Sequence, residues 1–356
     1  MPYPLIILGA GASYDSIKIE RYELGDQQTL KMWRPPLTNN IFDVSRFSRI
    51  IGKYDDVKSL ASTIINIVDS NIPFDFEKYL SEEEIKYPEK SYPQIIALRF
   101  YLAELLSKVS YHFYNHTNNH RHLIDQTEKI AGKAVVVNFN YDTLFEKNIN
   151  YINNNKQIDS YISGDIKVIK IHGAHNWRFT PIVEISKNNV YEYFISKGQE
   201  LNKEYKNHEI YPIIMNNFDY SSEDFDLNKY REYTDGSLGG IWSYYLPAIA
   251  IPIASKAEYI CPESHISMLN TNLPMIDRIL IIGWRAQDEY LLKLLKENLK
   301  DNIQLTIVSS NEKNAGEIAL KFNDIKQIKK ENITISKSEG YTNFMINREY
   351  EQFLNK

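Results

Sequence analysis

Short, largely apolar runs that are rich in β-branched residues recur along the chain, and each stops at a polar or glycine-containing turn. They cover residues 4–8, 134–137, 166–171, 278–282 and 305–308. The run 134–137 has no polar alternation at all, which is typical of a strand buried on both faces in the middle of a parallel sheet. The runs therefore predict the strands of an α/β domain.

Apolar residues at three- and four-residue spacing predict helices in the intervals. The longest candidate is 92–115, and the others cover 38–47, 55–70, 75–85, 123–130, 287–299, 312–322 and 341–354. Residues 190–195 and 210–215 are further strand candidates, whereas residues 15–36 are charged and irregular and predict a long loop that could fold over a ligand. The alternation of strands and helices predicts an α/β fold with a Rossmann-like parallel sheet, helices on both faces and an inserted helical subdomain.

The order of the elements suggests how the chain is divided. Residues 1–37 and 132–340 are expected to form the Rossmann-like domain, with 176–245 as an irregular insertion. Residues 38–131 are helical throughout and predict the inserted subdomain. Residues 341–356 predict a C-terminal helix.

Composition excludes several classes of protein. The single cysteine, Cys261, rules out an intramolecular disulfide framework and a multi-cysteine zinc site. A net charge of −5 gives no electrostatic footprint for nucleic-acid binding. The longest strongly apolar run, 246–254, is about half of the ~20 residues that a membrane-spanning helix needs. We expect a soluble, cytoplasmic globular protein with no membrane or direct nucleic-acid contact, and the apolar N-terminus fits a first strand better than a signal peptide.

Two polar side chains follow the run 134–137 where its strand should end. They are Asn140 and Asp142, and ligands of open α/β sheets bind beyond the carboxyl ends of the strands. Thr143 and Glu146 stand at capping-box spacing and predict the start of a helix. The alternative is structural: Asp142 or Thr143 caps this helix and Asn140 stabilises a turn.

The first strand runs into Gly9, Ala10, Gly11, Ala12 and Ser13. Small residues allow a tight turn and let backbone N–H groups approach a phosphate. Tyr14 stands where the third glycine of the dinucleotide fingerprint would be, and no acidic residue closes a second strand about 20 residues on. The turn therefore fits either a phosphate site or a simple strand–helix connection.

Histidine provides the remaining candidate chemistry. His172 follows the run 166–171 and precedes Gly173, so it should lie level with Asn140 and could serve as a general base. The alternative is a histidine hydrogen-bonded to the backbone. His112, His116 and His120 recur every four residues, but they lack the glutamate of H-E-x-x-H and no cysteine or carboxylate completes a site, so we expect no metal.

Four segments stand together in order and spacing: GAGAS at 9–13, NYD at 140–142, KIHG at 170–173 and IIGW at 281–284. This set resembles the sirtuin-like (silent-information-regulator-like) family, in particular its bacterial antiphage-defence branch of NAD-consuming effectors that lack the zinc ribbon. The resemblance covers about residues 1–15, 130–175 and 245–325. It is weak in the helical insert and in 176–245.

The resemblance implies roles for individual residues. The pyrophosphate of NAD+ would be lined by Gly9, Ala10, Gly11, Ala12 and Ser13. Asn140 and Asp142 would hold the nicotinamide ribose and position the attacking water, with His172 as the catalytic base. Gly283 and Trp284 would pass near the adenosine half. The adenine ribose would lie near Ser309, Ser310 and Asn311.

The departures from the family pattern are informative. Sirtuin deacylases carry four zinc-binding cysteines soon after the histidine–glycine motif, and that interval holds none here. Their absence disfavours deacylation and leaves NAD+ cleavage intact. The family's arginine after the glycine turn has no clear counterpart, and Arg34 is the nearest candidate.

The resemblance thus implies an NAD+ glycohydrolase with NAD+ as substrate, producing ADP-ribose and nicotinamide and acting in antiphage defence by NAD+ depletion. Two alternatives remain open: an NAD-dependent protein deacylase or ADP-ribosyltransferase, and a non-catalytic NAD or ADP-ribose sensor. Because unregulated hydrolysis would kill the host, we expect activation by assembly into a homo-oligomer or by a separate partner. A HerA-type ATPase is favoured over an Argonaute-type protein, and the sequence leaves open whether cyclic ADP-ribose also forms.

Overall fold

The chain forms two compact units in the computed structural model. The structure describes residues 3–69, 88–116, 118–155, 157–179, 182–184, 212–214, 227–234, 241–251 and 259–355, with a few isolated positions between them. Unit 1 comprises Met1–Leu37, Phe113–His172 and Ala257–Lys356, and unit 2 comprises Thr38–His112 and Gly173–Lys256. Each unit is described by itself.

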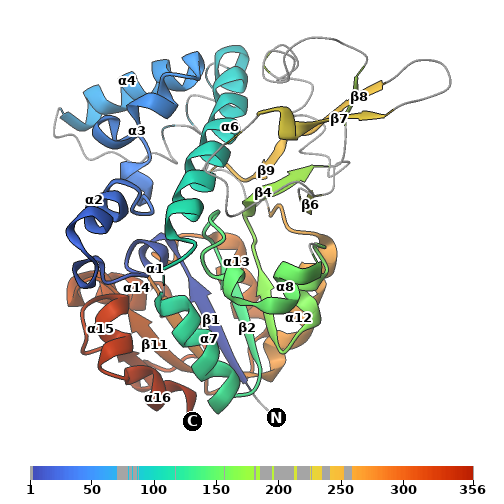
Figure 1. Ribbon diagram of the computed structural model, residues 1–356. Coiled ribbons are helices and arrows are strands. Elements are labelled where there is room, and N and C mark those ends of the chain that lie inside the picture. Colours follow the sequence, from blue (N-terminus) through green and yellow to red (C-terminus); the bar gives the residue numbers. More distant parts are fainter. Residues whose placement is uncertain are drawn as a thin grey trace. The chain divides into compact units, whose positions relative to one another are not determined.

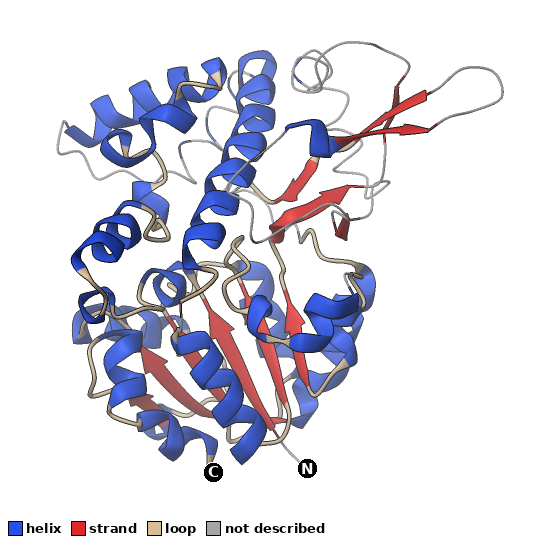
Figure 2. Cartoon of the chain, in the orientation of Figure 1, coloured by secondary structure: helices blue, strands red, loops and turns tan. Residues whose placement is uncertain are grey.

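Unit 1 is built on a six-stranded sheet with the order β12-β11-β10-β1-β2-β3 (Figure 2). All neighbouring strands are parallel. The strands are β1 (Tyr3–Leu8), β2 (Ala134–Asn138), β3 (Ile166–Ile169), β10 (Ile276–Ile282), β11 (Gln304–Val308) and β12 (Ile333–Ile335). Every residue of β2 is buried, so helices cover both faces there. The predicted Rossmann-like fold is confirmed, and only β12, a partly exposed edge strand of three residues, escaped the sequence pattern.

The strand order reverses at β1. From this strand the chain builds outward through β2 and β3, and it then returns to β10 on the other side before adding β11 and β12. This is the doubly wound order, in which ligands bind beyond the carboxyl ends of the two strands that flank the reversal. The turns after β1 and β10 therefore lie where such a fold holds its ligands.

Helices of unit 1 cover this sheet, and α7 crosses in front of β1 in Figure 1. They are α1 (Ala10–Tyr14), α2 (Leu24–Met32), α7 (Asn119–Ile130), α8 (Asn150–Asn155), α9 (Ser160–Ser163), α12 (Glu263–Asn272), α13 (Glu289–Asn298), α14 (Glu312–Lys321), α15 (Gly340–Ile346) and α16 (Glu349–Leu354). The predicted single C-terminal helix is two helices, because Arg348 adopts a left-handed φ of 58° that interrupts them. None of the described helices is both long and apolar enough to cross a bilayer.

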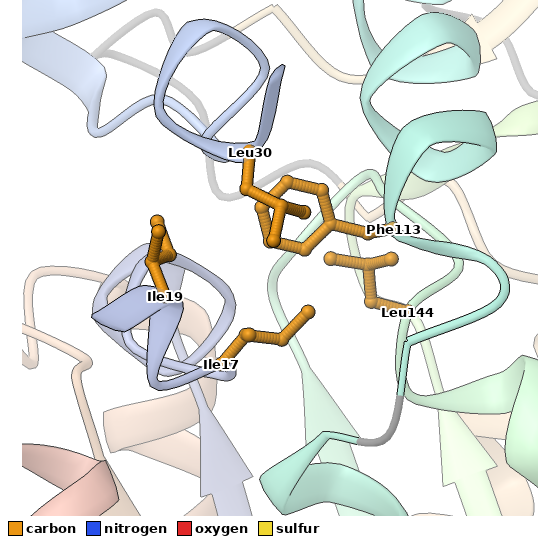
Figure 3. Close-up of a cluster of buried hydrophobic side chains, with 5 residues drawn as sticks. All are labelled: Ile17, Ile19, Leu30, Phe113 and Leu144. Atoms are coloured by element: carbon orange, nitrogen blue, oxygen red, sulfur yellow. The ribbon is translucent and has the colours of Figure 1, made fainter. Parts of the chain in front are cut away.

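The predicted loop at 15–36 is largely folded. It contains a 3₁₀ turn (Ile19–Arg21) and α2, and its apolar side chains enter a buried cluster (Figure 3). The cluster consists of Ile17, Ile19, Leu30, Phe113 and Leu144, with Tyr22 and Trp33 packed against it. The expectation of a long irregular loop was wrong because these scattered apolar residues are too far apart in sequence to give a helical pattern.

Unit 2 combines helices with strands. Its helices are α3 (Val44–Ile51), α4 (Asp55–Asp69) and most of α6 (Pro88–Phe113), and its three-stranded sheets are β6-β4-β9 and β5-β8-β7. These strands are β4 (Gly173–Phe179), β5 (Ile182–Glu184), β6 (Pro212–Ile214), β7 (Arg231–Thr234), β8 (Ile241–Tyr244) and β9 (Pro247–Ile249). The predicted helix 75–85 and strand 190–195 lie outside the described residues, apart from isolated positions.

The compact units differ from the predicted ranges in two ways. Residues 113–131 belong to unit 1, where α7 packs against α15 and α16. Residues 173–256 join the helices of 38–112, and contacts within unit 2 explain why. Arg99 of α6 donates a hydrogen bond to the carbonyl of Ile249, and the Ser110 hydroxyl lies 3.0 Å from Nε2 of His175.

The three spaced histidines do not share a helix face. His112 lies on α6, His116 lies in the connection that follows it, and His120 lies on α7. His120 is fully buried, with its ring centroid 5.6 Å from that of Phe145 and 5.5 Å from that of Tyr341. Neither ring nitrogen of His120 has a hydrogen-bond partner among the described residues.

Burial, and to a lesser extent charge repulsion by Lys147 and Lys170, lowers the pKa of His120 to about 3. Between pH 6.5 and this value the unfolded chain binds a proton at His120 that the folded chain does not bind. Stability therefore falls as the pH falls through this window, by up to ~1.4 kcal/mol per pH unit.

We predict that His120→Phe weakens this acid sensitivity. Between pH 6.5 and pH 5 the variant should lose about 2 kcal/mol less unfolding free energy than the wild type, measured by urea denaturation. His122→Phe is the matched control, since His122 is exposed on the same helix and should leave the pH dependence as it is. Equal pH dependence in His120→Phe and wild type would contradict the prediction.

Candidate functional site

The turns after β1 and β10 pack backbone against backbone. The Gly9 N–H donates to the carbonyl of Ile282 (3.0 Å), and the Gly11 N–H donates to that of Gly283 (3.1 Å). A Cβ on Gly9 would lie 2.6 Å from the Gly283 oxygen, and one on Gly283 would lie 2.5 Å from the Gly11 Cα. Gly283 also has a left-handed φ of +61°. Glycine is therefore required on both sides of this contact.

This packing changes the interpretation of the glycine turn. The N–H groups of Gly9, Gly11 and Ala12 all donate within the chain, so they are not open donors for a phosphate. The small residues bring the two turns together, a role that neither alternative of the sequence analysis named. A pyrophosphate contact for Gly9, Ala10, Gly11, Ala12 and Ser13 stays a prediction.

Ser13 and Asn140 join the β1 turn to the segment after β2. The Asn140 side-chain amide donates to the Ser13 hydroxyl (2.8 Å), and both residues are buried. The Asn140 backbone N–H donates to the side-chain oxygen of Asn138 (3.0 Å), which holds the turn. Within the described part of the chain the side-chain oxygen of Asn140 accepts no hydrogen bond, so it remains available as an acceptor.

Asp142 has a local role in the same turn. Its Oδ1 accepts a hydrogen bond from the Leu144 N–H (3.0 Å), a bond within the turn and not the helix cap that the structural alternative expected. Its backbone carbonyl accepts one from the Lys170 ammonium (2.6 Å). Oδ2 of the carboxylate is the oxygen that remains for a ligand.

A buried ion pair holds this segment against β3. Lys170 pairs with Glu146, and both side chains are 0% exposed. Burial raises the pKa of Glu146, and the charge of Lys170 opposes that shift. Glu146 thus serves as the partner of Lys170, and the predicted capping box is replaced by a 3₁₀ turn (Glu146–Asn148).

His172 follows Lys170 and Ile171 and contacts two other segments. Its Nε2 lies 2.9 Å from Oδ2 of Asp288, and the His172 side chain is 25% exposed. Its ring packs edge-on to Phe139 with centroids 5.0 Å apart, and Phe139 stacks on Trp284 at 5.0 Å and 5°. Sequence analysis missed Asp288, which fell inside the predicted helix 287–299, whereas the structure begins α13 at Glu289 and makes Asp288 its N-cap.

Direct contacts therefore link all four segments of the sequence motif. The β1 turn contacts Gly283 and Trp284, and it contacts Asn140 through Ser13. Phe139, beside Asn140, contacts both His172 and Trp284. An amide oxygen, a carboxylate and an imidazole accordingly come from strand ends at one edge of the sheet.

The residues after β11 have local partners. Asn311 caps α14 by accepting from the Asn314 N–H (2.9 Å), and the Ser310 hydroxyl accepts from the Asn314 side chain (3.0 Å). The Ser309 carbonyl accepts from the Gly340 N–H (2.7 Å). Their place near an adenine ribose stays a prediction.

Arg34 lies against the end of α1. Its Nε donates to the Tyr14 carbonyl (2.9 Å), and its guanidinium lies 3.8 Å from the Tyr14 ring centroid. Elsewhere, no group of three metal-ligating side chains is arranged for an ion in the portions of the chain that the structure covers.

No protein-family model and no curated protein match the chain. Solved structures do. A Sir2-homologue mutant in complex with 2′-O-acetyl ADP ribose gives a TM-score of 0.43 at 12% identity, over 99% of this chain and 94% of that chain. A Sir2 homologue–NAD complex gives 0.41 at 12% identity, over 99% and 90%. Sir2 with an inhibitor, 2′-O-acetyl-ADP-ribose and a deacetylated p53 peptide gives 0.38 at 14% identity, over 99% and 94%. Likeness at this level transfers no activity, so function has to be inferred from the site itself.

We predict that Lys170→Met destabilises the fold by about 3–5 kcal/mol, because it leaves the buried Glu146 carboxylate without its cationic partner. The double variant Lys170→Met/Glu146→Leu should recover most of this loss in urea denaturation. Lys167→Met on the same strand is the control, since Lys167 is only half-buried and donates to two backbone carbonyls. A double variant as unstable as Lys170→Met would contradict the account.

Proposed function

We propose that this chain is an NAD+ glycohydrolase that binds NAD+ at the carboxyl ends of β1, β2, β3 and β10. It would cleave the bond between nicotinamide and ribose with water to give ADP-ribose, nicotinamide and a proton. One observation carries the proposal: the four segments that resemble the sirtuin-like family are connected by direct contacts at the edge where a doubly wound sheet binds dinucleotides.

The chemistry suits these groups. Nicotinamide leaves as a neutral molecule from a cationic ring, so no general acid is needed. The sugar develops oxocarbenium character in the transition state, and nearby oxygen atoms stabilise its positive charge. The free side-chain oxygen of Asn140 can accept a hydrogen bond from the attacking water, and Oδ2 of Asp142 can accept one from a ribose hydroxyl. His172 takes the proton released by the water.

Two alternatives make different predictions. Deacylation or ADP-ribosyl transfer needs an acceptor, and nicotinamide release would then depend on an acyl-lysine or an acceptor protein. The chain has a single cysteine, so the four-cysteine zinc ribbon of the deacylases has no counterpart. Burial also raises the pKa of Cys261, which disfavours a thiolate nucleophile. A non-catalytic sensor would bind NAD+ or ADP-ribose tightly without turnover.

The biological setting belongs to the same proposal. We place the protein in the cytoplasm as an antiphage effector that depletes NAD+ during infection. Its activity would be released by homo-oligomeric assembly or by a partner, with a HerA-type ATPase favoured over an Argonaute-type protein. Control by assembly is expected because unregulated NAD+ cleavage would kill the host.

The test is to incubate the purified chain with NAD+, with and without the protein encoded beside it, and to resolve the products by chromatography. We predict stoichiometric ADP-ribose and nicotinamide. Asn140→Ala and His172→Ala should each lower the rate by about 10²–10⁴-fold, the usual loss when a general base or a preorganised hydrogen-bonding group is removed.

Matched controls are Asn343→Ala and His122→Ala, which replace exposed residues on α15 and α7 and should retain the wild-type rate. Nicotinamide release that requires an acyl-lysine would support the deacylase alternative. Tight binding without turnover would support the sensor, and intact NAD+ with no binding would overturn the proposed function.

A further inference from the structure

The carboxylate of Asp288 is held by two hydrogen bonds. Oδ1 accepts from the Leu291 N–H (2.7 Å), which makes Asp288 the N-cap of the ten-residue helix α13. Oδ2 lies 2.9 Å from Nε2 of His172. Because the helix fixes one oxygen, the other presents a fixed hydrogen-bond acceptor to the imidazole. The Asp288 side chain is only 14% exposed, so water competes little for this contact.

The connection that carries Asp288 also contacts the His172 ring indirectly, through Phe139. This connection, residues 283–288, begins with Gly283 and Trp284, and Trp284 stacks on the Phe139 ring against which His172 packs. The Tyr141 ring also lies near the imidazole, tilted by 30°, with ring centroids 6.3 Å apart. Among the described residues, Asp288 and Tyr141 are the titratable side chains in contact with His172. The imidazole is thus held at Nε2 by Asp288 and lies beside the rings of Phe139 and Tyr141.

The carboxylate of Asp288 decides which nitrogen of His172 is basic. An ionised carboxylate only accepts hydrogen bonds, so Nε2 has to carry the hydrogen in the neutral ring. The lone pair then lies on Nδ1, and no hydrogen bond from the described residues occupies that atom. In this tautomer Nδ1 is the nitrogen that can accept a proton.

We propose that Asp288 is a positioning residue that holds His172 in the Nε2–H tautomer and thereby makes Nδ1 the atom that accepts the proton of the attacking water. This inference rests on the proposed function. As the water oxygen bonds to the anomeric carbon, the carbon–nitrogen bond breaks and its electron pair leaves with nicotinamide. The water proton passes to Nδ1, and the imidazolium keeps its Nε2–H bond to Asp288, whose negative charge stabilises it. The proton later returns to solvent.

Substitutions at Asp288 separate this role from helix capping. Asparagine and serine both cap helices about as well as aspartate, so α13 should remain intact in Asp288→Asn and Asp288→Ser. The asparagine amide can donate or accept, so it no longer selects one tautomer, and the serine side chain is too short to replace the carboxylate. Asp277→Asn is the matched control, because it changes a carboxylate paired with Arg278 at the opposite end of β10.

The first experiment needs no enzymatic activity. Two-bond ¹H–¹⁵N correlation spectra of the ligand-free full chain, labelled at histidine, report which nitrogen of His172 carries the hydrogen. We expect the hydrogen on Nε2 in the wild type and in Asp277→Asn, and a mixture of tautomers in Asp288→Asn. A wild-type spectrum with the hydrogen on Nδ1, or an unchanged spectrum in Asp288→Asn, would overturn the proposal.

The second experiment measures NAD+ cleavage with the activated protein. Asp288→Asn and Asp288→Ser should lower kcat by roughly 10²-fold or more and leave KM within about twofold of wild type. Asp277→Asn should match the wild type in both respects.

The outcomes distinguish the two levels of inference. If His172→Ala is inactive while Asp288→Asn keeps the wild-type kcat, the positioning role fails and the proposed function stands. If the wild type cleaves no NAD+ under any condition, the proposed function and the catalytic role of Nδ1 both fail. The spectra then still decide whether Asp288 selects the tautomer.

Discussion

The contact between the turns that follow β1 and β10 is the constraint on which the candidate site depends. At this point the strand order reverses, and the two backbones approach so closely that a side chain on Gly9 or Gly283 would collide with the opposite turn. The contact places Ser13 and Trp284 on adjoining segments. Ser13 then binds Asn140 in the turn after β2, and Trp284 stacks on Phe139, which packs against His172. The backbone packing thus positions the segments that carry the polar groups.

Buried charges stabilise the segment that carries Asn140 and Asp142. Lys170 neutralises Glu146 in the interior and also binds the Asp142 carbonyl. The next residue after Glu146 is Lys147, whose ammonium donates to the carbonyls of Phe113 and Tyr114 at the end of α6, and burial lowers the pKa of Lys147 to about 7. A buried ion pair such as Lys170–Glu146 contributes little net stability compared with apolar packing. It nevertheless fixes one geometry, because an unpaired buried charge is costly.

Much of the fold and part of the site could be predicted from the sequence. The apolar runs predicted five of the six strands in the sheet of unit 1, because a strand that is buried on both faces is a continuous apolar run. The short, partly exposed β12 has no such run. Asn140 and His172 stood out because they follow such strands. Asp288 and the Lys170–Glu146 pair did not, because a capping aspartate and a charged residue in a strand acquire their partners only in three dimensions. The glycine turn suggested a phosphate site, yet its N–H groups are largely used to join β1 to β10.

The most direct measurement is a crystal structure of the His172→Ala variant with NAD+. This variant should still bind the dinucleotide but cleave it slowly. The account predicts that the nicotinamide ribose lies beside Asn140 and the site of the His172→Ala substitution, and that the pyrophosphate passes the turns after β1 and β10. Density for NAD+ at any other edge of the sheet, or a ribose out of reach of Asn140, would contradict it.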